Sequence, residues 1–186
     1  MKKILLHSNN AKALTGFGKH AKNILKYLYK TGKYEIVEFA NGTLWGHEST
    51  RGRPWECEGS LPNNPSFLHD MKTDKSKQAG AGYGQYTIDL AIDKYKPDIY
   101  IGTEDIWAFS NFWDKPWWDK INSMIWTTLD SLPILPLAKE AAKKTKNFYV
   151  WSSFAERAMK EDGHENVGTL HGAIDISSFH RLKDTE

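Results

Sequence analysis

The sequence predicts a doubly wound α/β domain, with a mostly parallel, Rossmann-like sheet between two layers of helices. Short apolar segments alternate with amphipathic helical segments along the chain, which is typical of βαβ units with right-handed crossovers. A glycine-containing turn lies between the first apolar segment and the first helical one. The length of 186 residues suits a single domain of ordinary size.

The first half of the chain predicts two strands, one helix and an insertion. Residues 2–8 form a short apolar run that predicts a buried strand. In residues 17–31 apolar side chains recur at helical spacing with lysines on the outer side, and Gly32 can end the helix in a left-handed conformation. Residues 34–40 alternate like a second strand. Residues 41–80 are rich in Gly, Pro, Asn and Ser, and we expect a long, partly irregular insertion there.

The second half of the chain predicts further strands separated by helices. Pro97 ends one helix, and Pro136 suits the first turn of the next. Ser153 and Glu156 have capping-box spacing before a helix that Gly163 closes. The predicted strands span residues 98–102, 123–129, 147–152 and 166–170.

The predicted topology indicates where a ligand would bind. In doubly wound sheets ligands lie outside the carboxyl ends of the strands, at the point where the strand order reverses. With the common order 3-2-1-4-5-6, the first and fourth predicted strands are neighbours at that point. The loops that follow the strands then form one crevice lined by Asn9, Asn10, Thr15, Gly16, Gly18, Glu104, Asp105, Thr128, Asp130, Ser131, Ser152, His171 and Gly172.

Gly16 and Gly18 have a chemical role available in this crevice. Glycine lets backbone amides approach an anion closely, and the helix that begins near Phe17 directs the positive end of its dipole to the same place. A plain loop-to-helix turn explains the same residues without any ligand.

The stretch from Gly16 to Ala21 also has the G-x-G-x-x-A spacing of a dinucleotide-binding turn. In that motif the first glycine follows the strand almost directly, and an acidic residue lies at the tip of the second strand. Here "SNNAKALT" separates the strand from Gly16, and Glu38 falls inside the predicted second strand. An NAD(P)-dependent oxidoreductase is therefore the least favoured interpretation.

Five motifs together resemble the N-terminal domain of a GT-B glycosyltransferase of the group 1 retaining type. They are an extended loop with a G-G or G-x-G element before the first helix, a KPD before an apolar strand, a central strand ending near a His or Asp, a strand ending in Ser before a capped helix, and a strand leading to an hGvD…F segment. In this chain they read "NNAKALTGFGKHAKNIL", "KPDIYIG", "IWTTLDSLP", "YVWSSFAERAMKEDG" and "LHGAIDISSF". The similarity covers nearly the whole chain outside residues 41–80.

The resemblance implies transfer of a sugar from a nucleotide-sugar donor to an acceptor hydroxyl, with retention at the anomeric carbon. It places the donor diphosphate at Gly16, Phe17 and Gly18, and it gives Asp130, where many members have His, the catalytic position near the transferred sugar. It implies that the other crevice residues lie on the acceptor side of the cleft. The acceptor would be a sugar, a lipid or a small molecule. The resemblance implies neither a metal nor another cofactor, and the sequence contains no D-x-D motif.

In this family a second Rossmann-like domain supplies most of the donor site, and it would begin where this sequence ends, at Glu186. We therefore expect the 1–186 chain to lack the C-terminal donor-binding domain and to be catalytically incomplete without it, whether it comes in the same polypeptide or as a partner subunit. The second interpretation is a non-catalytic Rossmann-like module that binds a nucleotide or a glycan as a partner subunit.

Composition favours a cytoplasmic protein. The formal charge of +2 gives no sign of nucleic-acid binding, and the single cysteine, Cys57, suits a reducing compartment. No apolar run approaches the ~20 residues of a membrane span. Peripheral membrane contact is a less favoured alternative, because a run of charges is usually a solvated helix face. Its candidate residues are Lys139, Lys143, Lys144 and Lys146 with Trp113, Trp117 and Trp118.

Overall fold

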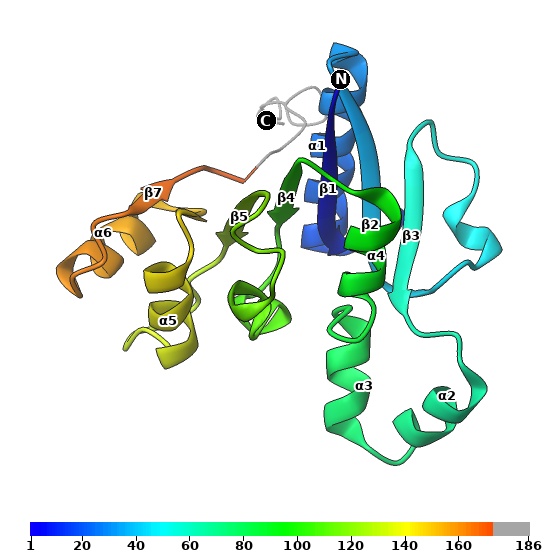
Figure 1. Ribbon diagram of the computed structural model, residues 1–186. Coiled ribbons are helices and arrows are strands. Elements are labelled where there is room, and N and C mark those ends of the chain that lie inside the picture. Colours follow the sequence, from blue (N-terminus) through cyan, green and yellow to red (C-terminus); the bar gives the residue numbers. More distant parts are fainter. Residues whose placement is uncertain (173–186) are drawn as a thin grey trace, which may run out of the picture.

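The structure, a computed structural model, describes residues 1–172 as a seven-stranded parallel sheet with helices on both faces (Figure 1). The strand order is β3-β2-β1-β4-β5-β6-β7. The strands are β1 (Lys2–Asn9), β2 (Tyr34–Leu44), β3 (Glu56–Leu61), β4 (Ile99–Gly102), β5 (Asn122–Thr127), β6 (Asn147–Val150) and β7 (Val167–Thr169). The α-helices are α1 (Gly16–Thr31), α2 (Pro65–Met71), α3 (Lys75–Gly82), α4 (Ile88–Tyr95), α5 (Pro136–Lys144) and α6 (Ser153–Glu161). Short 3₁₀ helices are η1 (Glu48–Thr50), η2 (Ile106–Phe109) and η3 (Phe112–Asp114). The predicted fold class is confirmed.

Strand β1 lies at the centre of the sheet between β2 and β4, and Ile4 to Ser8 are all buried. A strand covered on both faces reads as a continuous apolar run, as the sequence of β1 does. Successive side chains point to opposite faces. Leu5 therefore belongs to a large core shared with α4, α5 and α6, and Leu6 to a smaller core beneath α1.

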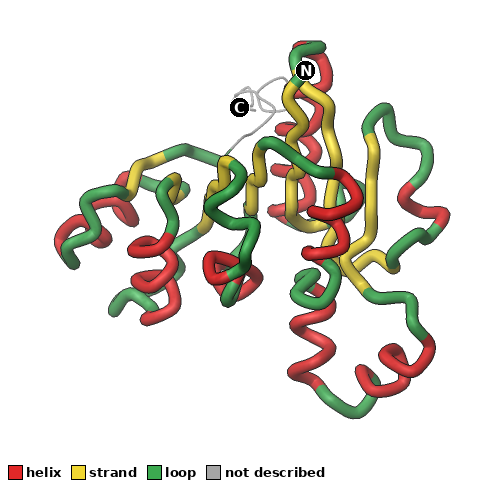
Figure 2. The backbone as a smooth tube through the Cα atoms, in the orientation of Figure 1, coloured by secondary structure: helices red, strands yellow, loops and turns green. Residues whose placement is uncertain are grey.

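The two hydrophobic cores lie on opposite faces of the sheet and hold the two layers of helices against it. Ala21 and Leu25 pack α1 onto one face of the sheet, while α4, α5 and α6 cover the other face (Figure 1). Helices α2 and α3 form a lobe that projects away from the sheet (Figure 2). Within residues 1–172, α1 is the one helix that covers its face, so its outer surface faces away from the remaining helices.

Residues 41–80 contain regular structure that sequence analysis missed. Strand β2 continues to Leu44, and β3 pairs with it in parallel from Glu56, opposite Val37, to Leu61, with a register shift between Ala40 and Leu44. The segment also contains α2 and α3. The sequence of β3, "ECEGSL", has no apolar run, because it is an edge strand whose buried Glu58 is paired with Lys94.

The additional strand changes which loops are neighbours. The third predicted strand, β4, lies next to β1, and the fourth predicted strand, β5, lies one position further out. The expected contact between the loops that follow β1 and β5 is therefore wrong. The loop after β1 instead adjoins the loop after β4, which carries Glu104 and Asp105.

The predicted helix ends are confirmed with one exception. Gly32 ends α1 at φ 64, and Pro136 lies in the first turn of α5. The cap of α6 is Ser152, whose hydroxyl accepts the Ala155 amide at 3.2 Å, so the capping box expected at Ser153 is wrong by one residue. Glu156 pairs instead with Lys160 at 2.6 Å.

A buried ion pair joins the loop after β1 to the segment that leads into β3. Arg53 Nε lies 2.7 Å from Glu38 Oε2, and both side chains are almost fully buried. The Ala11 amide donates to Glu38 Oε1 and Trp55 Nε1 donates to Oε2, each at 2.8 Å. Arg53 also donates to Asn10 Oδ1 at 2.7 Å. The Glu38 carboxylate of β2 therefore binds both the loop after β1 and the segment from Arg53 to Trp55.

Replacing the cation of this pair should destabilise the protein strongly. We expect Arg53→Met to lower the free energy of unfolding by about 3–5 kcal/mol, because it leaves the Glu38 carboxylate buried without its partner. Urea denaturation measures the loss. Lys139→Met removes one side of a surface pair with Asp162 and should cost at most about 1 kcal/mol. Equal losses in the two variants would contradict the importance of the buried pair.

Candidate functional site

The candidate site lies at the carboxyl end of the sheet, between β1 and β4. Strands β2 and β3 lie on one side of β1, and β4 to β7 lie on its other side, so the strand order reverses between β1 and β4. Such a point of reversal is where doubly wound sheets bind ligands. The loop of residues 10–15, the start of α1 and the residues after β4 converge there.

The first turn of α1 presents backbone amides at this point. Thr15 caps the helix, and its hydroxyl accepts the Gly18 amide at 3.0 Å. The Lys19 amide donates to the Thr15 carbonyl oxygen. The amides of Gly16 and Phe17 then remain without an acceptor inside the helix. Together with the positive end of the helix dipole, they form a place where an anion can bind.

The two glycines of the loop differ in their surroundings. A Cβ atom at Gly18 would lie 2.6 Å from the Ala13 carbonyl oxygen and 2.9 Å from that of Asn10. A Cβ atom at Gly16 would meet nothing within 4 Å. Gly18 is therefore required by the close approach of the helix to its own loop, whereas Gly16 faces open space.

Asn10 and Thr15 hold the loop in shape. Asn10 Oδ1 accepts the Lys12 amide at 2.9 Å as well as Arg53, and its Nδ2 donates to Thr43 Oγ1 at 2.8 Å. The Thr15 hydroxyl accepts Asn9 Nδ2 at 3.0 Å. The polar atoms of the Asn10 side chain are thus engaged within the protein.

Glu104 follows β4 and is the buried carboxyl group of the site, at 3% exposure. Its main chain is held by Thr127 Oγ1, which donates to the Glu104 carbonyl oxygen at 2.7 Å. Asn41 Nδ2 lies 3.4 Å from Oε2, and the Asp105 amide lies 3.4 Å from Oε1. Burial raises the pKa of Glu104 to about 7, and the hydrogen bonds from Asn41 and Asp105 only partly oppose that rise. Glu104 can therefore carry or release a proton near neutral pH.

A chain of buried polar groups that sequence analysis missed supports Glu104. His7 Nδ1 lies 2.7 Å from Tyr100 Oη, and its Nε2 lies 2.7 Å from Asn41 Oδ1. Burial lowers the pKa of His7 to about 4, so the ring is neutral at pH 7. Because Asn41 presents its amide nitrogen to Glu104, its oxygen accepts a hydrogen bond from His7 Nε2, and His7 Nδ1 then accepts one from the Tyr100 hydroxyl. The hydrogen bonds run in one direction, from Tyr100 to Glu104.

The sequence contained a signal for these residues. His7 and Asn41 are polar residues near the carboxyl ends of otherwise apolar strands, "KKILLHSN" and "YEIVEFAN". Because parallel strands end at the same edge of a sheet, such residues lie close together.

Asp105, Thr128 and Asp130 form a second acidic group between the loops after β4 and β5. Thr128 Oγ1 donates to Asp105 Oδ1 at 3.0 Å. Burial raises the pKa of Asp105; the bond from Thr128 opposes this, and the negative charge of Asp130 adds to it. Asp130 and Ser131 are exposed and border a small recess with Trp107. The structure therefore brings Asp130 near Asp105, but one strand away from the loop after β1.

Ser152, His171 and Gly172 lie at the ends of β6 and β7. Ser152 is the helix cap described above, and His171 Nδ1 donates to the Trp151 carbonyl oxygen at 3.1 Å. A Cβ atom at Gly172 would lie 2.8 Å from the Trp151 ring. Trp151 in turn contacts Phe17, with ring centroids 5.3 Å apart, which links this end of the sheet to α1. Residues 173–179 of the terminal motif lie outside the described residues.

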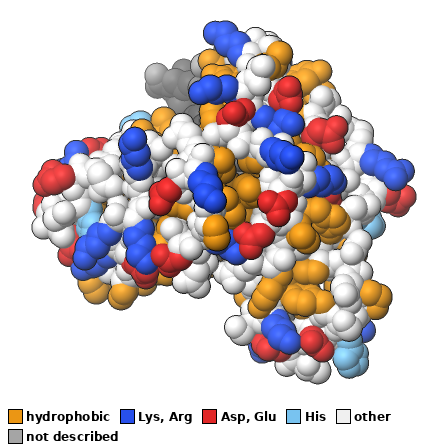
Figure 3. Space-filling model, in the orientation of Figure 1, with side chains coloured by type: hydrophobic (Ala, Val, Ile, Leu, Met, Phe, Trp, Pro, Cys, Tyr) orange, Lys and Arg blue, Asp and Glu red, His pale blue; other side chains and the backbone are white. Residues whose placement is uncertain are grey.

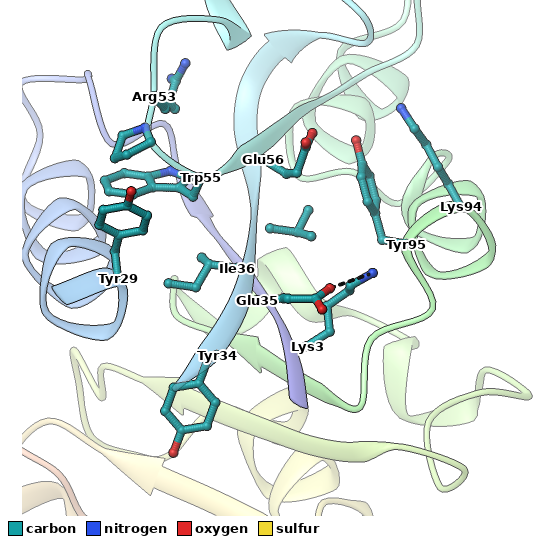
Figure 4. Close-up of a pocket in the computed structure, with 12 residues that line it drawn as sticks. Lys3, Tyr29, Tyr34, Glu35, Ile36, Arg53, Trp55, Glu56, Lys94 and Tyr95 are labelled. Atoms are coloured by element: carbon teal, nitrogen blue, oxygen red, sulfur yellow. Dashed lines mark ion pairs between the residues drawn. The ribbon is translucent and has the colours of Figure 1, made fainter. Parts of the chain in front are cut away.

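Two cavities lie in different parts of the sheet. A groove of about 660 Å³ opens beside the start of β2 and β3, and Figure 4 shows Tyr29 and Trp55 on one side of it and Tyr95 on the other. It is remote from the carboxyl ends of the strands. A smaller cavity of about 290 Å³ adjoins Asn9 and Asn41 at the carboxyl ends of β1 and β2, and it belongs to the candidate site.

Other sequence-based hypotheses can be placed in the structure. Glu38, the acidic residue of the dinucleotide hypothesis, is buried against Arg53 and Trp55 and does not reach the tip of β2. Of the aromatic residues considered for membrane contact, Trp113 and Trp118 are buried. Among residues 1–172 no cluster of three His, Cys, Asp or Glu side chains is arranged to hold a metal ion. None of the described helices combines the length and the apolar character needed to cross a bilayer.

Comparisons with known proteins bear on the fold. No family model matches the sequence, and no curated protein matches it. Among solved structures, the chain is similar to sucrose-phosphate synthase from Thermosynechococcus elongatus, with a TM-score of 0.57 and 12% identity over 98% of this chain and 51% of that one. It also matches UDP-GlcNAc 2-epimerase from Methanocaldococcus jannaschii, with a TM-score of 0.47 and 12% identity over 92% of this chain and 46% of that one. The chain thus spans about half the length of these structures. The first likeness confirms the expected similarity to a GT-B protein at the level of the fold.

The two loop glycines should respond differently to an added methyl group. We expect Gly18→Ala to lower the free energy of unfolding by about 1–3 kcal/mol, because its Cβ would press on two backbone carbonyl oxygens. Gly16→Ala should change it by less than about 1 kcal/mol, since that Cβ meets open space. Urea denaturation of both variants checks this. The assignment fails if Gly16→Ala is the more damaging change.

Glu104 should make stability depend on pH. Because its pKa in the folded state is raised from 4.5 to about 7, the folded protein gains stability from this group as the pH falls through 7, and loses it as the pH rises again. Glu104→Gln removes that dependence. The difference in free energy of unfolding, variant minus wild type, should therefore be larger above pH 7 than at pH 4.5. We expect this increase to be about 2–3 kcal/mol. Urea denaturation at both pH values measures the difference, and the exposed Glu161→Gln should show none of it.

Proposed function

We propose that residues 1–172 form the acceptor-side domain of a glycosyltransferase that uses a nucleotide-sugar donor and retains the configuration of the transferred sugar. One observation carries the proposal. The open amides at the start of α1 and the carboxyl groups of Glu104, Asp105 and Asp130 lie along one edge of the sheet, at and beside its point of reversal. The likeness in fold to a sucrose-phosphate synthase supports it.

In this proposal the donor diphosphate binds at the start of α1. The amides of Gly16 and Phe17 and the helix dipole would stabilise the negative charge that develops on the leaving diphosphate. Gly18 would contribute through the backbone geometry that it permits, because its own amide is bound to Thr15.

The acidic residues would act on the acceptor side. Asp130 is exposed and would lie closest to the transferred sugar, with Asp105 and Thr128 beside it. Glu104 would hydrogen-bond the acceptor hydroxyl at the floor of the site, either as a donor or as an acceptor, because its pKa is about 7. The acceptor would be a sugar, a lipid or a small molecule.

The remainder of the donor site would come from a second domain. The base and ribose contacts would lie there, in the same polypeptide or in a partner subunit. We expect the 1–186 chain alone to show negligible sugar transfer.

The proposal is tested with the 1–186 chain joined to, or mixed with, its second domain. Release of nucleoside diphosphate from a panel of nucleotide-sugars, with and without candidate acceptors, reports transfer. Asp130→Asn should reduce the acceptor-dependent rate about 100-fold or more, whereas Asp119→Asn, at an exposed site near the other end of β5, should leave it unchanged. Full activity of Asp130→Asn would remove the catalytic role of Asp130, and no turnover with any donor would remove the transferase.

A second candidate is a non-catalytic binding module that acts as a partner subunit. It is favoured by apolar side chains exposed at the carboxyl end of the sheet, including Leu14 of the loop after β1 at 91% and Phe154 in the first turn of α6 at 51%. In this candidate function these side chains would contact the partner domain or subunit. Saturable nucleotide-sugar binding without turnover, measured by calorimetry on the complete protein, would favour this candidate.

A further inference from the structure

The groove beside the start of β2 lies where the edge of the sheet is incomplete. Strand β2 begins at Tyr34, but β3 pairs with it only from Glu56, which lies opposite Val37. Among residues 1–172, residues 34–36 therefore border no strand on that side, and the space next to them is the groove of about 660 Å³. Pockets of this size are typical of ligand sites. The groove lies at the end of the strands opposite to the candidate site.

Aromatic rings from both layers of helices form the walls of this groove. Tyr29 of α1 lies with Trp55 on one side, and Tyr95 of α4 lies on the other (Figure 4). The rings of Tyr29 and Trp55 pack edge-on, with centroids 6.1 Å apart. Tyr29 remains 48% exposed. The groove therefore offers a ligand an aromatic surface at each wall.

Trp55 and Tyr95 are held in place by the protein itself. Trp55 Nε1 donates to the buried Glu38 carboxylate at 2.8 Å. The Tyr95 hydroxyl lies 3.4 Å from Glu58 Oε2, and Lys94 Nζ lies 4.8 Å from the centroid of the Tyr95 ring. Because these side chains are already ordered, a ligand that packs on them loses less entropy on binding.

The three cations that line the groove are each paired with a carboxylate. The pairs are Lys3–Glu35 at 3.2 Å, Arg53–Glu38 at 2.7 Å and Lys94–Glu58 at 2.7 Å. Glu56 adds an exposed carboxylate at the start of β3. Over the face seen in Figure 3, Lys and Arg side chains likewise lie among Asp and Glu. Positive charge is therefore not in surplus along the described lining, which favours a neutral ligand over a phosphate.

We propose that this groove binds a neutral oligosaccharide, with one sugar ring on Tyr29 and Trp55 and another beside Tyr95. The C–H face of a sugar ring packs on an aromatic ring, while its hydroxyls donate to carboxylates and accept from N–H groups. Glu56 and the open backbone of residues 34–36 offer such partners. Because the rings stand on two walls, the ligand must be longer than one sugar. This site goes beyond the proposed transferase function and does not depend on it.

The lining favours an oligosaccharide over an extended peptide, which is the other ligand that an open sheet edge can bind. Strand addition depends on a row of main-chain hydrogen bonds, and strands are commonly about five or six residues long. Only residues 34–36 are open here, and Pro54, which also lines the groove, has no N–H to donate. The aromatic walls therefore provide more of the binding surface than the edge does.

Isothermal titration calorimetry of the full chain with maltohexaose, cellohexaose, mannohexaose and chitohexaose tests the proposal. We expect at least one hexasaccharide to bind and its monosaccharide to show no measurable binding, because a single sugar reaches only one wall. Tyr29→Ala should weaken binding about tenfold, whereas Tyr29→Phe keeps the ring and should bind like wild type. Tyr27→Ala is the matched control on α1, since Tyr27 is 71% exposed and lies outside the groove. Circular dichroism melts confirm that the variants are folded.

The outcomes separate the alternatives. Failure of every hexasaccharide to bind would overturn the proposal, and so would equal affinities in Tyr29→Ala and Tyr27→Ala. Binding that is lost in Asp130→Asn but kept in Tyr29→Ala would overturn it as well, because the saccharide would then lie at the candidate site. Binding of a Lys-Val-Lys-Val-Lys-Val peptide that Tyr29→Ala abolishes, without binding of any hexasaccharide, would assign the groove to an extended peptide. Sugar transfer is not measured in these experiments, so their failure leaves the proposed function unaffected.

Discussion

The buried pair of Glu38 and Arg53 determines the shape of the candidate site. Two charges removed from water must be compensated by each other and by further hydrogen bonds. Here those bonds come from the backbone of Ala11, from the indole of Trp55 and, on the arginine side, from a contact with Asn10. The loop before α1 is consequently held by the centre of β2 and by the segment entering β3. The open amides at the start of α1 lie where they do because this loop cannot shift independently.

A second buried network sets the state of the acidic residue at the floor of the site. Tyr100, His7 and Asn41 form a directed chain of hydrogen bonds that ends at Glu104. Neutral His7 has one donor and one acceptor nitrogen, and because Asn41 Nδ2 faces Glu104, the chain ends in a donor to the carboxyl group. Burial outweighs that donor and keeps the pKa of Glu104 near neutral. A carboxyl group with two accessible protonation states can serve as either partner in a hydrogen bond to a hydroxyl.

Helix α1 combines three roles on three sides. Its first turn offers the amides of Gly16 and Phe17 to the crevice, and its inner side builds the small core with Leu6 and Leu25. Its outer side carries exposed lysines, which form no ion pair within residues 1–172, and the exposed Tyr27 and Tyr29. The opposite face of the protein pairs its charges instead.

The α/β class, the parallel sheet, the end of α1, the start of α5 and the acidic residues that follow β4 and β5 could all be predicted from the sequence. Each of these depends on local information: periodic burial, a glycine at φ 64 after α1, a proline in a first turn. The presence of β3, the position of β4 beside β1 and the pairing of Glu38 with Arg53 become apparent only in the folded protein. The folded protein also shows that Gly18 serves packing, while Gly16 faces open space. These features come from pairings between segments far apart in the sequence, where a charged strand such as β3 is stabilised by partners that its own pattern does not contain.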